Sequence, residues 1–231
     1  MPLPSLQAHT GTRLIFIRHG QIEANIYKLW YGSTDTKLTD TGIWQATQLG
    51  QYCREHLVNQ YQKNHPFLKS LPIYTSPLQR AHQTAEILTQ HLSDTLPIDL
   101  RLETGLAEYS LGALEGIAFS VLEKEHQLFE KLHQDIQYAP PGGESLLGAS
   151  QRCFSALQKI VTQHAGESVV IVSHGALLAL TFAILFHQAP QAWGKYQFNN
   201  TGISEILFEP EPKLIRLNET PHLQNISETH C

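Results

Sequence analysis

The chain has 231 residues, of which 42% are hydrophobic and 16% are charged, and its formal net charge is −5. This composition is typical of a globular protein with enough residues for a sizeable core. The negative charge argues against a general nucleic-acid-binding protein, although a few cations can still form a local pocket for a small anion. Three separated cysteines without a Cys-x-x-Cys pair, and no visible signal peptide or membrane span, predict free thiols in a soluble cytoplasmic protein.

The first element expected along the chain is a strand at residues 14–17. Four apolar residues run there without a break, which is typical of a strand buried on both faces in a parallel sheet. Arg18, His19 and Gly20 follow at once, at the end of the strand where open α/β sheets bind ligands. Residues 1–12 are expected to form a loose arm before this strand.

A helix is expected next, beginning within residues 38–42 with Thr39 or Asp40 as its N-cap. Apolar residues then recur every three or four positions and predict one buried helix face: Ile43, Ala46, Leu49, Cys53 and Leu57. Residues 59–70 are polar and are expected to form a surface connection.

Residues 71–75 predict a second strand. Ser76-Pro77 predicts the start of the helix that follows it, with Ser76 as the N-cap and Pro77 at the first helical position. Arg80 then lies in the first turn of this helix, again near the carboxyl end of a strand. Residues 98–102 alternate in polarity and predict a short edge strand.

The least regular part of the sequence predicts a helical insertion at about residues 106–144. A glycine-punctuated loop at its start carries two acidic residues, Glu108 and Glu115. A helix is expected at about residues 120–133, and Ser145 is expected to cap another helix after a proline and glycine breaker.

The strand-end pattern recurs late in the chain. Residues 169–172 are another apolar run, and His174 and Gly175 lie directly beyond its end. Because the carboxyl ends of parallel strands meet at one edge of a sheet, we expect the two His-Gly pairs to lie there together. An apolar helix is expected after Gly175.

The pattern as a whole predicts one α/β domain. A late strand is expected at residues 204–208, and the core is expected to span about residues 13–208. Residues 217–231 are polar and are expected to be flexible.

The residues at the strand ends suit phosphate chemistry. An imidazole such as that of His19 or His174 can attack phosphorus, act as a base or bind a metal, and a nearby arginine disfavours the metal. The guanidinium groups of Arg18 and Arg80 match pairs of phosphate oxygens and keep their charge near neutral pH. Taken singly, each residue also has an ordinary interpretation, as a packed histidine or an arginine in a surface ion pair.

Glu108 and Glu115 are rival candidates for carrying a proton to a leaving group, and the residues alone do not rank them. The sequence has no glycine loop for nucleotide phosphates and no nucleophile elbow. It also has no paired cysteines or His-Glu-x-x-His typical of zinc, so no metal site is expected.

Six ordered blocks resemble the histidine phosphatase superfamily, which has the phosphoglycerate mutase-like fold. The blocks are Arg18-His19-Gly20-Gln21 with Asn25; Leu38-Thr39-x-x-Gly42-x-x-Gln45-Ala46; residues 74–85 around Arg80; Leu106-Ala107-Glu108 with Gly112-x-Leu114-Glu115-Gly116; Pro141-Gly142-Gly143-Glu144-Ser145; and Val172-Ser173-His174-Gly175. A lone Arg-His-Gly would be a weak motif, whereas six blocks in order are specific. The resemblance implies a three-layer sandwich with a mostly parallel central sheet flanked by helices.

The resemblance also implies a role for each candidate residue. His19 would accept the phosphate, and Glu108 rather than Glu115 would donate the proton. Arg18, Arg80 and His174 would form the phosphate pocket. The further substrate-binding residues implied are Gln21, Asn25, Ser33 and Gly175.

Two positions depart from the family pattern. Ile22 stands where threonine or serine is usual, which removes a hydroxyl contact to the phosphate. Ala107 stands where arginine or asparagine is frequent and is expected to alter the acid loop. Neither is one of the core site residues, so activity is still expected.

The expected reaction is metal-independent hydrolysis of small phosphorylated metabolites through a phosphohistidine, without a cofactor. A phosphoglycerate mutase shares the first step, but residues 31–36 and the Pro-Gly-Gly-Glu-Ser block are more typical of a phosphatase. A catalytically silent phospho-ligand or protein-binding module is the third hypothesis, although His19 and Glu108 are both present. No nucleic-acid or membrane partner is expected, and the protein is expected to be a monomer or a homodimer.

Overall fold

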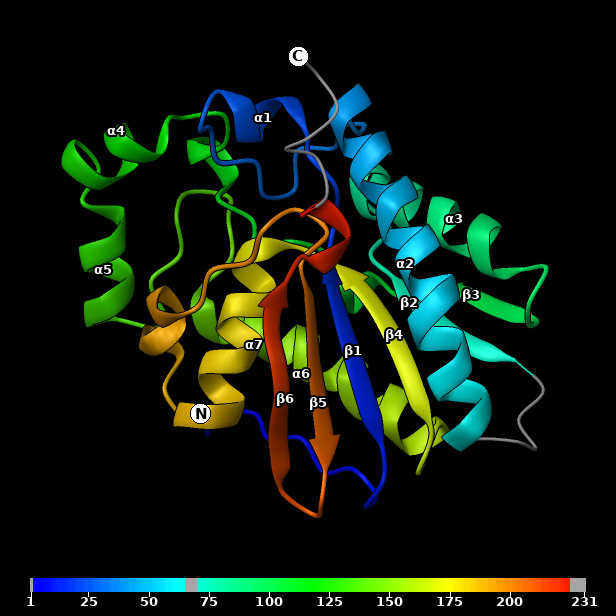
Figure 1. Ribbon diagram of the computed structural model, residues 1–231. Coiled ribbons are helices and arrows are strands. Elements are labelled where there is room, and N and C mark those ends of the chain that lie inside the picture. The colour runs from blue at the N-terminus through cyan, green and yellow to red at the C-terminus, as the bar shows by residue number, and fades with distance from the viewer. Residues whose placement is uncertain (1, 65–69, 225–231) are drawn as a thin grey trace.

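The computed structural model describes residues 2–64 and 70–224, and six strands form its central sheet. The strands are β1 (Arg13–Arg18), β2 (Leu71–Thr75), β3 (Ile98–Leu102), β4 (Ser168–Ser173), β5 (Ile203–Phe208) and β6 (Pro212–Glu219). In the order β3-β2-β4-β1-β5-β6, the first four are parallel, β5 is antiparallel to β1, and β6 is antiparallel to β5. The mostly parallel sheet is confirmed, and β1 and β4 end at its upper edge in Figure 1.

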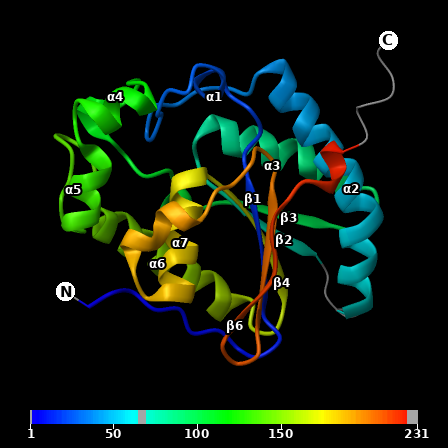
Figure 2. The same cartoon turned by 60° about the vertical axis from the view of Figure 1, so that its left-hand side comes forward.

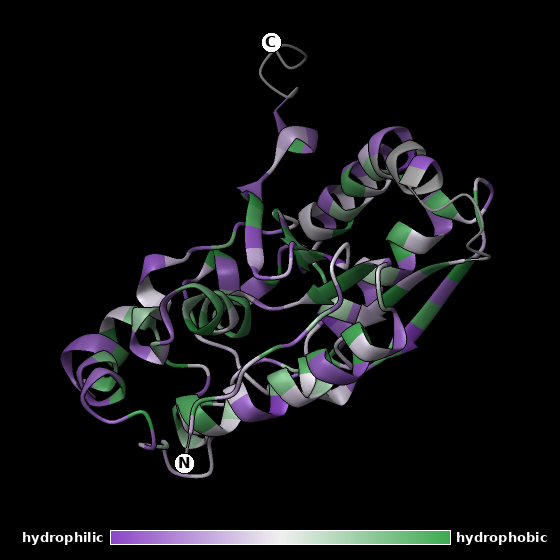
Figure 3. Ribbon diagram, turned by 90° about the horizontal axis from the view of Figure 1, so that it is seen from below, coloured by the Kyte–Doolittle hydropathy of each residue, from purple (hydrophilic) through white to green (hydrophobic). Residues whose placement is uncertain are grey.

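Helices cover both faces of the sheet, because alternate residues of a strand point to opposite sides. The helices are α1 (Glu23–Ile26), α2 (Asp40–Asn64), α3 (Gln79–Leu92), α4 (Phe119–Lys124), α5 (Leu128–Gln134), α6 (Leu146–Gln163) and α7 (Gly175–His187). Leu14 and Phe16 of β1 pack with α6 and α7, whereas Ile15 and Ile17 pack with α2 and α3. Figures 1 and 2 show α6 and α7 on one face of the sheet and α2 and α3 on the other. Figure 3 shows hydrophobic residues in green within the strands between them. The predicted three-layer sandwich is therefore confirmed.

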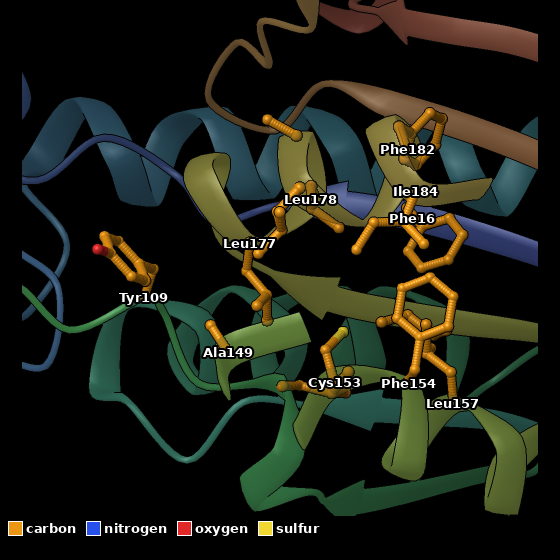
Figure 4. Close-up of a cluster of buried hydrophobic side chains, with 14 of the residues drawn as sticks. Phe16, Tyr109, Ala149, Cys153, Phe154, Leu157, Leu177, Leu178, Phe182 and Ile184 are labelled. Atoms are coloured by element: carbon orange, nitrogen blue, oxygen red, sulfur yellow. The ribbon is translucent and has the colours of Figure 1, made fainter. Parts of the chain in front are cut away.

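Phe16 and Phe182 form the centre of the layer between the sheet and α7. Both side chains are fully buried, and their rings meet edge to face with centroids 5.5 Å apart. Figure 4 shows them among the aliphatic side chains of α6 and α7. Truncating such a buried phenylalanine to alanine costs about 3–5 kcal/mol. This packing therefore holds β1, and the residues at its end, against the two helices.

The first long helix, α2, is longer than its sequence indicates. Thr39 is the N-cap, since its Oγ1 accepts the Gly42 N–H at 3.0 Å. The helix continues to Asn64, so the prediction of a surface connection from residue 59 is wrong. Ile43 is 47% exposed, although it was predicted to be buried, and the side chain of Leu57 lies outside the described residues.

Two other helix predictions also need correction. Helix α3 begins at Gln79 with Leu78 as its N-cap, so Ser76 does not cap it. The single helix predicted at about residues 120–133 is two short helices, α4 and α5. Gln127, with a φ of 49°, adopts a left-handed conformation between them and interrupts the helical hydrogen bonding.

The chain ends contribute to the packing within the described residues. Thr12 is fully buried, and Leu6 packs against the apolar cluster of α6 and α7. Strand β6 was not predicted, and its last residues fall in the segment that was expected to be flexible.

Ser145 caps α6 as predicted, because its Oγ accepts the Gly148 N–H at 3.0 Å. Residues 225–231 lie outside the described residues.

Candidate active site

The end of β1 presents Arg18 and His19, and neighbouring chain segments hold their backbone. The His19 N–H donates to the Ser173 carbonyl at 3.0 Å, which continues the pairing of β1 with β4. From the other side, the Thr201 N–H donates to the Arg18 carbonyl and Asn200 Nδ2 donates to the His19 carbonyl, both at 3.0 Å. Thr201 has a φ of 56°, which is uncommon for a β-branched residue. The strand end is therefore fixed between two segments.

His19 is buried, and its hydrogen bond defines its tautomer. Nδ1 lies 2.6 Å from the Gly20 carbonyl, which can only accept, so Nδ1 carries the proton. Burial and the charges of Arg18 and Arg80 hold the pKa of His19 well below its ordinary value of 6.5. The ring is therefore neutral near pH 7, and Nε2 keeps a lone pair that can attack phosphorus.

His174, at the end of β4, contacts both Arg80 and Ser76. Arg80 Nε donates to Nδ1 at 3.2 Å, so in the neutral ring Nε2 carries the proton and donates to Ser76 Oγ at 2.7 Å. Burial and the charge of Arg80 hold the pKa of His174 well below its ordinary value. The rings of His19 and His174 lie with their centroids 5.2 Å apart. The two His-Gly pairs of the sequence therefore meet at one edge of the sheet.

Two guanidinium groups are held beside these rings by backbone carbonyls. Arg80 is 1% exposed and donates to the carbonyls of Thr34 at 2.8 Å and Gly32 at 2.7 Å. Arg18 donates to the Phe198 carbonyl at 2.5 Å, and no described residue partners its Nε. Burial lowers the pKa of both arginines. The negative charge of Glu108 is the strongest influence in the opposite direction. Carbonyls orient the cations without neutralising them, so the edge attracts an anion.

Glu108 lies at the N-terminus of α7 and is 7% exposed. Its Oε1 accepts the N–H groups of Tyr109 at 2.9 Å and Leu177 at 2.8 Å, and its Oε2 accepts the Ala176 N–H at 3.1 Å. The carboxylate interacts electrostatically with both Arg18 and Arg80, which places it with the other predicted site residues. Because Oε2 accepts only one of these bonds, it keeps a position for a transferable proton.

Glu115 has a different environment, on the outer side of the loop that cradles Arg80. Its carboxylate accepts the backbone N–H groups of Ser33 at 2.7 Å and Thr34 at 2.6 Å, and both hydroxyl groups. Ser110 Oγ also donates to it, at 3.2 Å. Burial acts to raise the pKa of Glu115, but the hydrogen bonds from Thr34 and Ser33 outweigh it and lower the pKa. The structure therefore separates the two rival acids by their partners.

The remaining predicted substrate-binding residues lie around the same edge. Asn25 Oδ1 accepts the Ile22 N–H at 3.0 Å and Asn200 Nδ2 at 3.2 Å, which leaves the Asn25 amide group to donate elsewhere. Gln21 Oε1 accepts the Thr39 hydroxyl at 3.0 Å. The substrate contacts expected of these two residues, and of Ser33, stay predictions.

Glycine at position 175 leaves close packing space for the side chain of Arg18. A Cβ atom on Gly175 would lie 3.2 Å from Arg18 Nε, closer than most real contacts of this kind.

Ile22 and Ala107, the two residues that depart from the family pattern, both contribute to the structure around the site. Ile22 is 2% exposed and packs in a small apolar cluster, and the Ala107 carbonyl accepts Arg152 Nη1 at 2.9 Å.

Four residues that organise the site were not predicted to do so. They are Ser76, which accepts from His174; Thr84, which accepts the Gly20 N–H at 3.0 Å; Arg152, which donates to the carbonyls of Gly105 and Ala107; and Asn200. Their partners lie 45 or more residues away along the chain, so hydrophobic periodicity carries no signal for these contacts. Ser76 and Thr84 lie in the family-like block at residues 74–85, but that block gave them no role in the site, and the capping pattern at Ser76 indicated a different role.

Within residues 2–64 and 70–224, no group of three or more histidine, cysteine or acidic side chains gathers as metal ligands do. No helix in the same part of the chain has the length and apolar character needed to cross a membrane.

The model of the histidine phosphatase superfamily (branch 1) matches residues 14–220. The chain belongs to this superfamily. The structure of a phosphoserine phosphatase from Entamoeba histolytica, in complex with 3-phosphoglyceric acid, superposes with a TM-score of 0.76 at 30% identity, covering 92% of this chain and 99% of that one. A broad-specificity phosphatase of Saccharomyces cerevisiae is 28% identical over 91% of this chain and 87% of its own length. A phosphoglycerate mutase-like protein of Arabidopsis thaliana is 29% identical over 71% of this chain and 67% of its own length.

This protein is a hydrolase of phosphate monoesters, because it belongs to the histidine phosphatase superfamily and its relatives include a broad-specificity phosphatase. The family and fold predicted from the six sequence blocks are confirmed.

Proposed function

We propose that the protein hydrolyses phosphate monoesters of small metabolites through a phosphohistidine formed on His19. The observation that carries this proposal is the neutral imidazole of His19 facing two arginines at the sheet edge. A cationic imidazole would have no lone pair to attack with, whereas this ring keeps Nε2 available and surrounds it with charge that attracts a phosphate dianion.

In the first step, the lone pair of His19 Nε2 forms a bond to phosphorus while the bond to the leaving oxygen breaks. The departing oxygen takes its electron pair and a proton from Glu108 Oε2. Arg18 and Arg80 stabilise the charge on the three remaining oxygens, which is the dominant source of catalysis in phosphoryl transfer.

In the second step, Glu108 acts as the base. It takes a proton from water, the water oxygen bonds to phosphorus, and the electron pair of the N–P bond returns to His19 Nε2. The products are the alcohol and inorganic phosphate, and both side chains regain their starting protonation states. His174, whose ring nitrogens already contact Arg80 and Ser76, orients the guanidinium of Arg80 in this scheme.

The first experiment is hydrolysis of a panel of phosphomonoesters by the wild type and His19→Ala, with trapping of phosphate on the protein. We expect several esters to be hydrolysed, all turnover to be lost in His19→Ala, and an acid-labile phosphate to appear only on the wild type. Turnover retained in His19→Ala contradicts the proposal.

Glu108→Gln tests the proton donor separately. Esters of alcohols need a proton on the leaving oxygen, whereas 4-nitrophenolate leaves without one. We therefore expect kcat/KM, which reports the steps up to formation of the phosphohistidine, to fall roughly 10²–10⁴-fold on alkyl esters and much less on 4-nitrophenyl phosphate. The value of kcat is expected to fall for both ester classes, because the base of the second step is also lost. An equal loss of kcat/KM on both ester classes contradicts a proton-donor role for Glu108.

A mutase is the second candidate, because one relative is named as phosphoglycerate mutase-like. A mutase returns the phosphate from His19 to a sugar acid instead of to water. Incubation with phosphoglycerate distinguishes the two, since a mutase isomerises it and a phosphatase releases inorganic phosphate. The silent binding module predicts neither product and no phosphate on His19.

We also propose a reducing, cytoplasmic location. Its support is that Cys53 and Cys153 are buried and free, and that burial raises the pKa of their thiols to about 12 and about 11. Such thiols are unreactive near pH 7. Cys231 lies outside the described residues.

A further inference from the structure

The loop of residues 198–202, which leads into β5, holds the backbone of two residues of the proposed active site. The Thr201 N–H is shared between the carbonyls of Arg18 at 3.0 Å and His19 at 3.3 Å. Asn200 Nδ2 also donates to the His19 carbonyl, at 3.0 Å. These bonds fix the strand end from which the proposed nucleophile and one phosphate-binding arginine project.

Thr201 is held in a conformation that it would not adopt readily by itself. Its φ of 56° is unfavourable for a β-branched residue and persists only where the surroundings enforce it. The residue is fully buried, and its hydroxyl donates to the Asn200 carbonyl at 2.7 Å. Because the single hydroxyl proton is used in this bond, Oγ1 accepts from its other neighbour.

That neighbour is His222, in the 3-10 helix η4 (Pro221–Leu223) that follows β6. Its Nε2 lies 2.9 Å from Thr201 Oγ1, so Nε2 carries the ring proton and donates it. The other ring nitrogen, Nδ1, is buried, has no partner among the described residues and carries no proton. Burial lowers the pKa of His222 to about 4, so the ring keeps this neutral form near pH 7.

The packing of η4 holds His222 at the loop. Figures 1 and 2 show this turn, in red, beside α2, and the His222 ring lies 6.0 Å from that of Tyr52 on this helix, measured between centroids. Asn218, at the end of β6, supports the same loop, because its Oδ1 accepts the Asn199 N–H at 2.6 Å. The segment after β5 therefore holds the loop at two neighbouring points.

We propose that His222 is a positioning residue for phosphoryl transfer at His19. Its N–H holds the Thr201 hydroxyl, and the Thr201 backbone in turn holds the end of β1. A shift of Thr201 would displace the nucleophilic nitrogen of His19, and in-line attack on phosphorus depends on its placement. The inference rests on the proposed function, and it assigns a part in that function to the last described turn of the chain.

The test separates the N–H of His222 from its ring. His222→Phe keeps an aromatic ring but has no donor, whereas His222→Gln has no ring but can place its amide nitrogen where Nε2 lies. The measurement is the single-turnover rate of phosphohistidine formation from 4-nitrophenyl phosphate, under conditions where urea unfolding shows each protein to be fully folded. We expect His222→Phe to be slower than the wild type by about fivefold, as for one lost hydrogen bond, and His222→Gln to stay within about twofold. A merely structural ring leaves this rate unchanged in both folded variants.

A double-mutant cycle tests whether His222 acts through Thr201. Thr201→Val removes the acceptor, so adding His222→Phe to it should slow the reaction no further. His56→Phe is the matched control, because His56 is exposed on α2 and also stacks on Tyr52, with centroids 4.3 Å apart. Its own Nδ1 donates to the Tyr52 carbonyl at 3.0 Å, and the control should leave the rate unchanged.

The outcomes separate this inference from the proposed function. A wild-type rate in His222→Phe, a rate in His222→Gln no higher than in His222→Phe, or additive effects in the cycle each overturn the positioning role. The phosphatase still stands in these cases if turnover is lost in His19→Ala. A wild type that releases no nitrophenolate and takes up no phosphate on His19 overturns both. If His222→Phe does not fold, His222→Leu takes its place in the comparison, because leucine also has no donor.

Discussion

Glu115 offers a sharp test of how the site is held together, because it touches the loop behind Arg80 and not the reacting atoms. Its carboxylate accepts both N–H groups and both hydroxyls of Ser33 and Thr34. The carbonyls of Gly32 and Thr34 in turn accept the two terminal nitrogens of Arg80. Glu115 is therefore expected to act as a positioning residue for this guanidinium.

The magnitude for Glu115→Gln follows from which oxygen is replaced. The amide oxygen can occupy the place of Oε1, which accepts from Ser33, Ser110 and Leu111. The amide nitrogen then faces the Thr34 N–H, where two donors meet and a bond to a charged acceptor is lost. Such a loss costs about 1.5–3 kcal/mol, and the partial exposure of Glu115 favours the lower half. We expect the free energy of unfolding to fall by about 2 kcal/mol.

The assay is urea unfolding of the wild type and Glu115→Gln between pH 3 and 7, together with steady-state kinetics. Because the folded-state pKa of Glu115 is lowered, its contribution to stability is complete above the ordinary value of 4.5. That contribution is lost as the pH falls through the lowered pKa, so the two proteins should converge in stability at low pH. We also expect kcat/KM to fall about tenfold, less than the 10²–10³-fold loss of one whole transition-state donor.

Two results would refute this reasoning. One is a stability difference between wild type and Glu115→Gln that does not shrink in acid, because it would then not come from the charged carboxylate. The other is a loss confined to alkyl esters that spares 4-nitrophenyl phosphate, because this is the behaviour expected of the proton donor. Glu108→Gln is the matched control, with the same chemical change on an acid that faces the site.

Three further outcomes follow from the buried groups. In phosphate-free buffer, kcat/KM should stay high as the pH falls below 6.5, because burial and two arginines lower the pKa of His19. A fall of kcat/KM in acid that is centred at or above pH 6.5 would contradict this. The stability contribution of the buried histidines should be complete above pH 6.5 and should fall below it, by up to about 1.4 kcal/mol per pH unit for each of His19 and His174, because the unfolded chain binds protons that the folded chain does not bind. His174→Gln should remove the share of one histidine from the slope measured by urea unfolding, and an unchanged slope would contradict the lowered pKa of His174. Asn200→Ala should lower the free energy of unfolding in urea by about 1 kcal/mol and should also lower kcat/KM, because the Asn200 amide bridges His19 and Asn25. An unchanged kcat/KM would show that this bridge is not needed for activity.

The sheet and its edge could be predicted because they depend on local patterns. Two unbroken apolar runs, at β1 and β4, indicate buried parallel strands, and the polar residues after them have to meet at one edge. The helix boundaries were less predictable, because tertiary contacts override capping patterns. Ser76 illustrates this: it reads as an N-cap in the sequence, but its Oγ accepts from His174, and α3 begins three residues later.

The choice between Glu108 and Glu115 shows where reasoning from residues alone ends. Both are glutamates in one glycine-rich loop, and their chemistry is identical until the chain folds. Their roles are set by donors that arrive from elsewhere: the first turn of α7 for Glu108, and residues 33–34 for Glu115. In the proposed mechanism, the acid beside Arg18 and Arg80 passes a proton to the substrate, whereas the acid enclosed by the hydroxyls and amides of residues 33–34 holds the loop behind Arg80. The proposal thus assigns two roles to the same kind of side chain according to which segment supplies its hydrogen bonds.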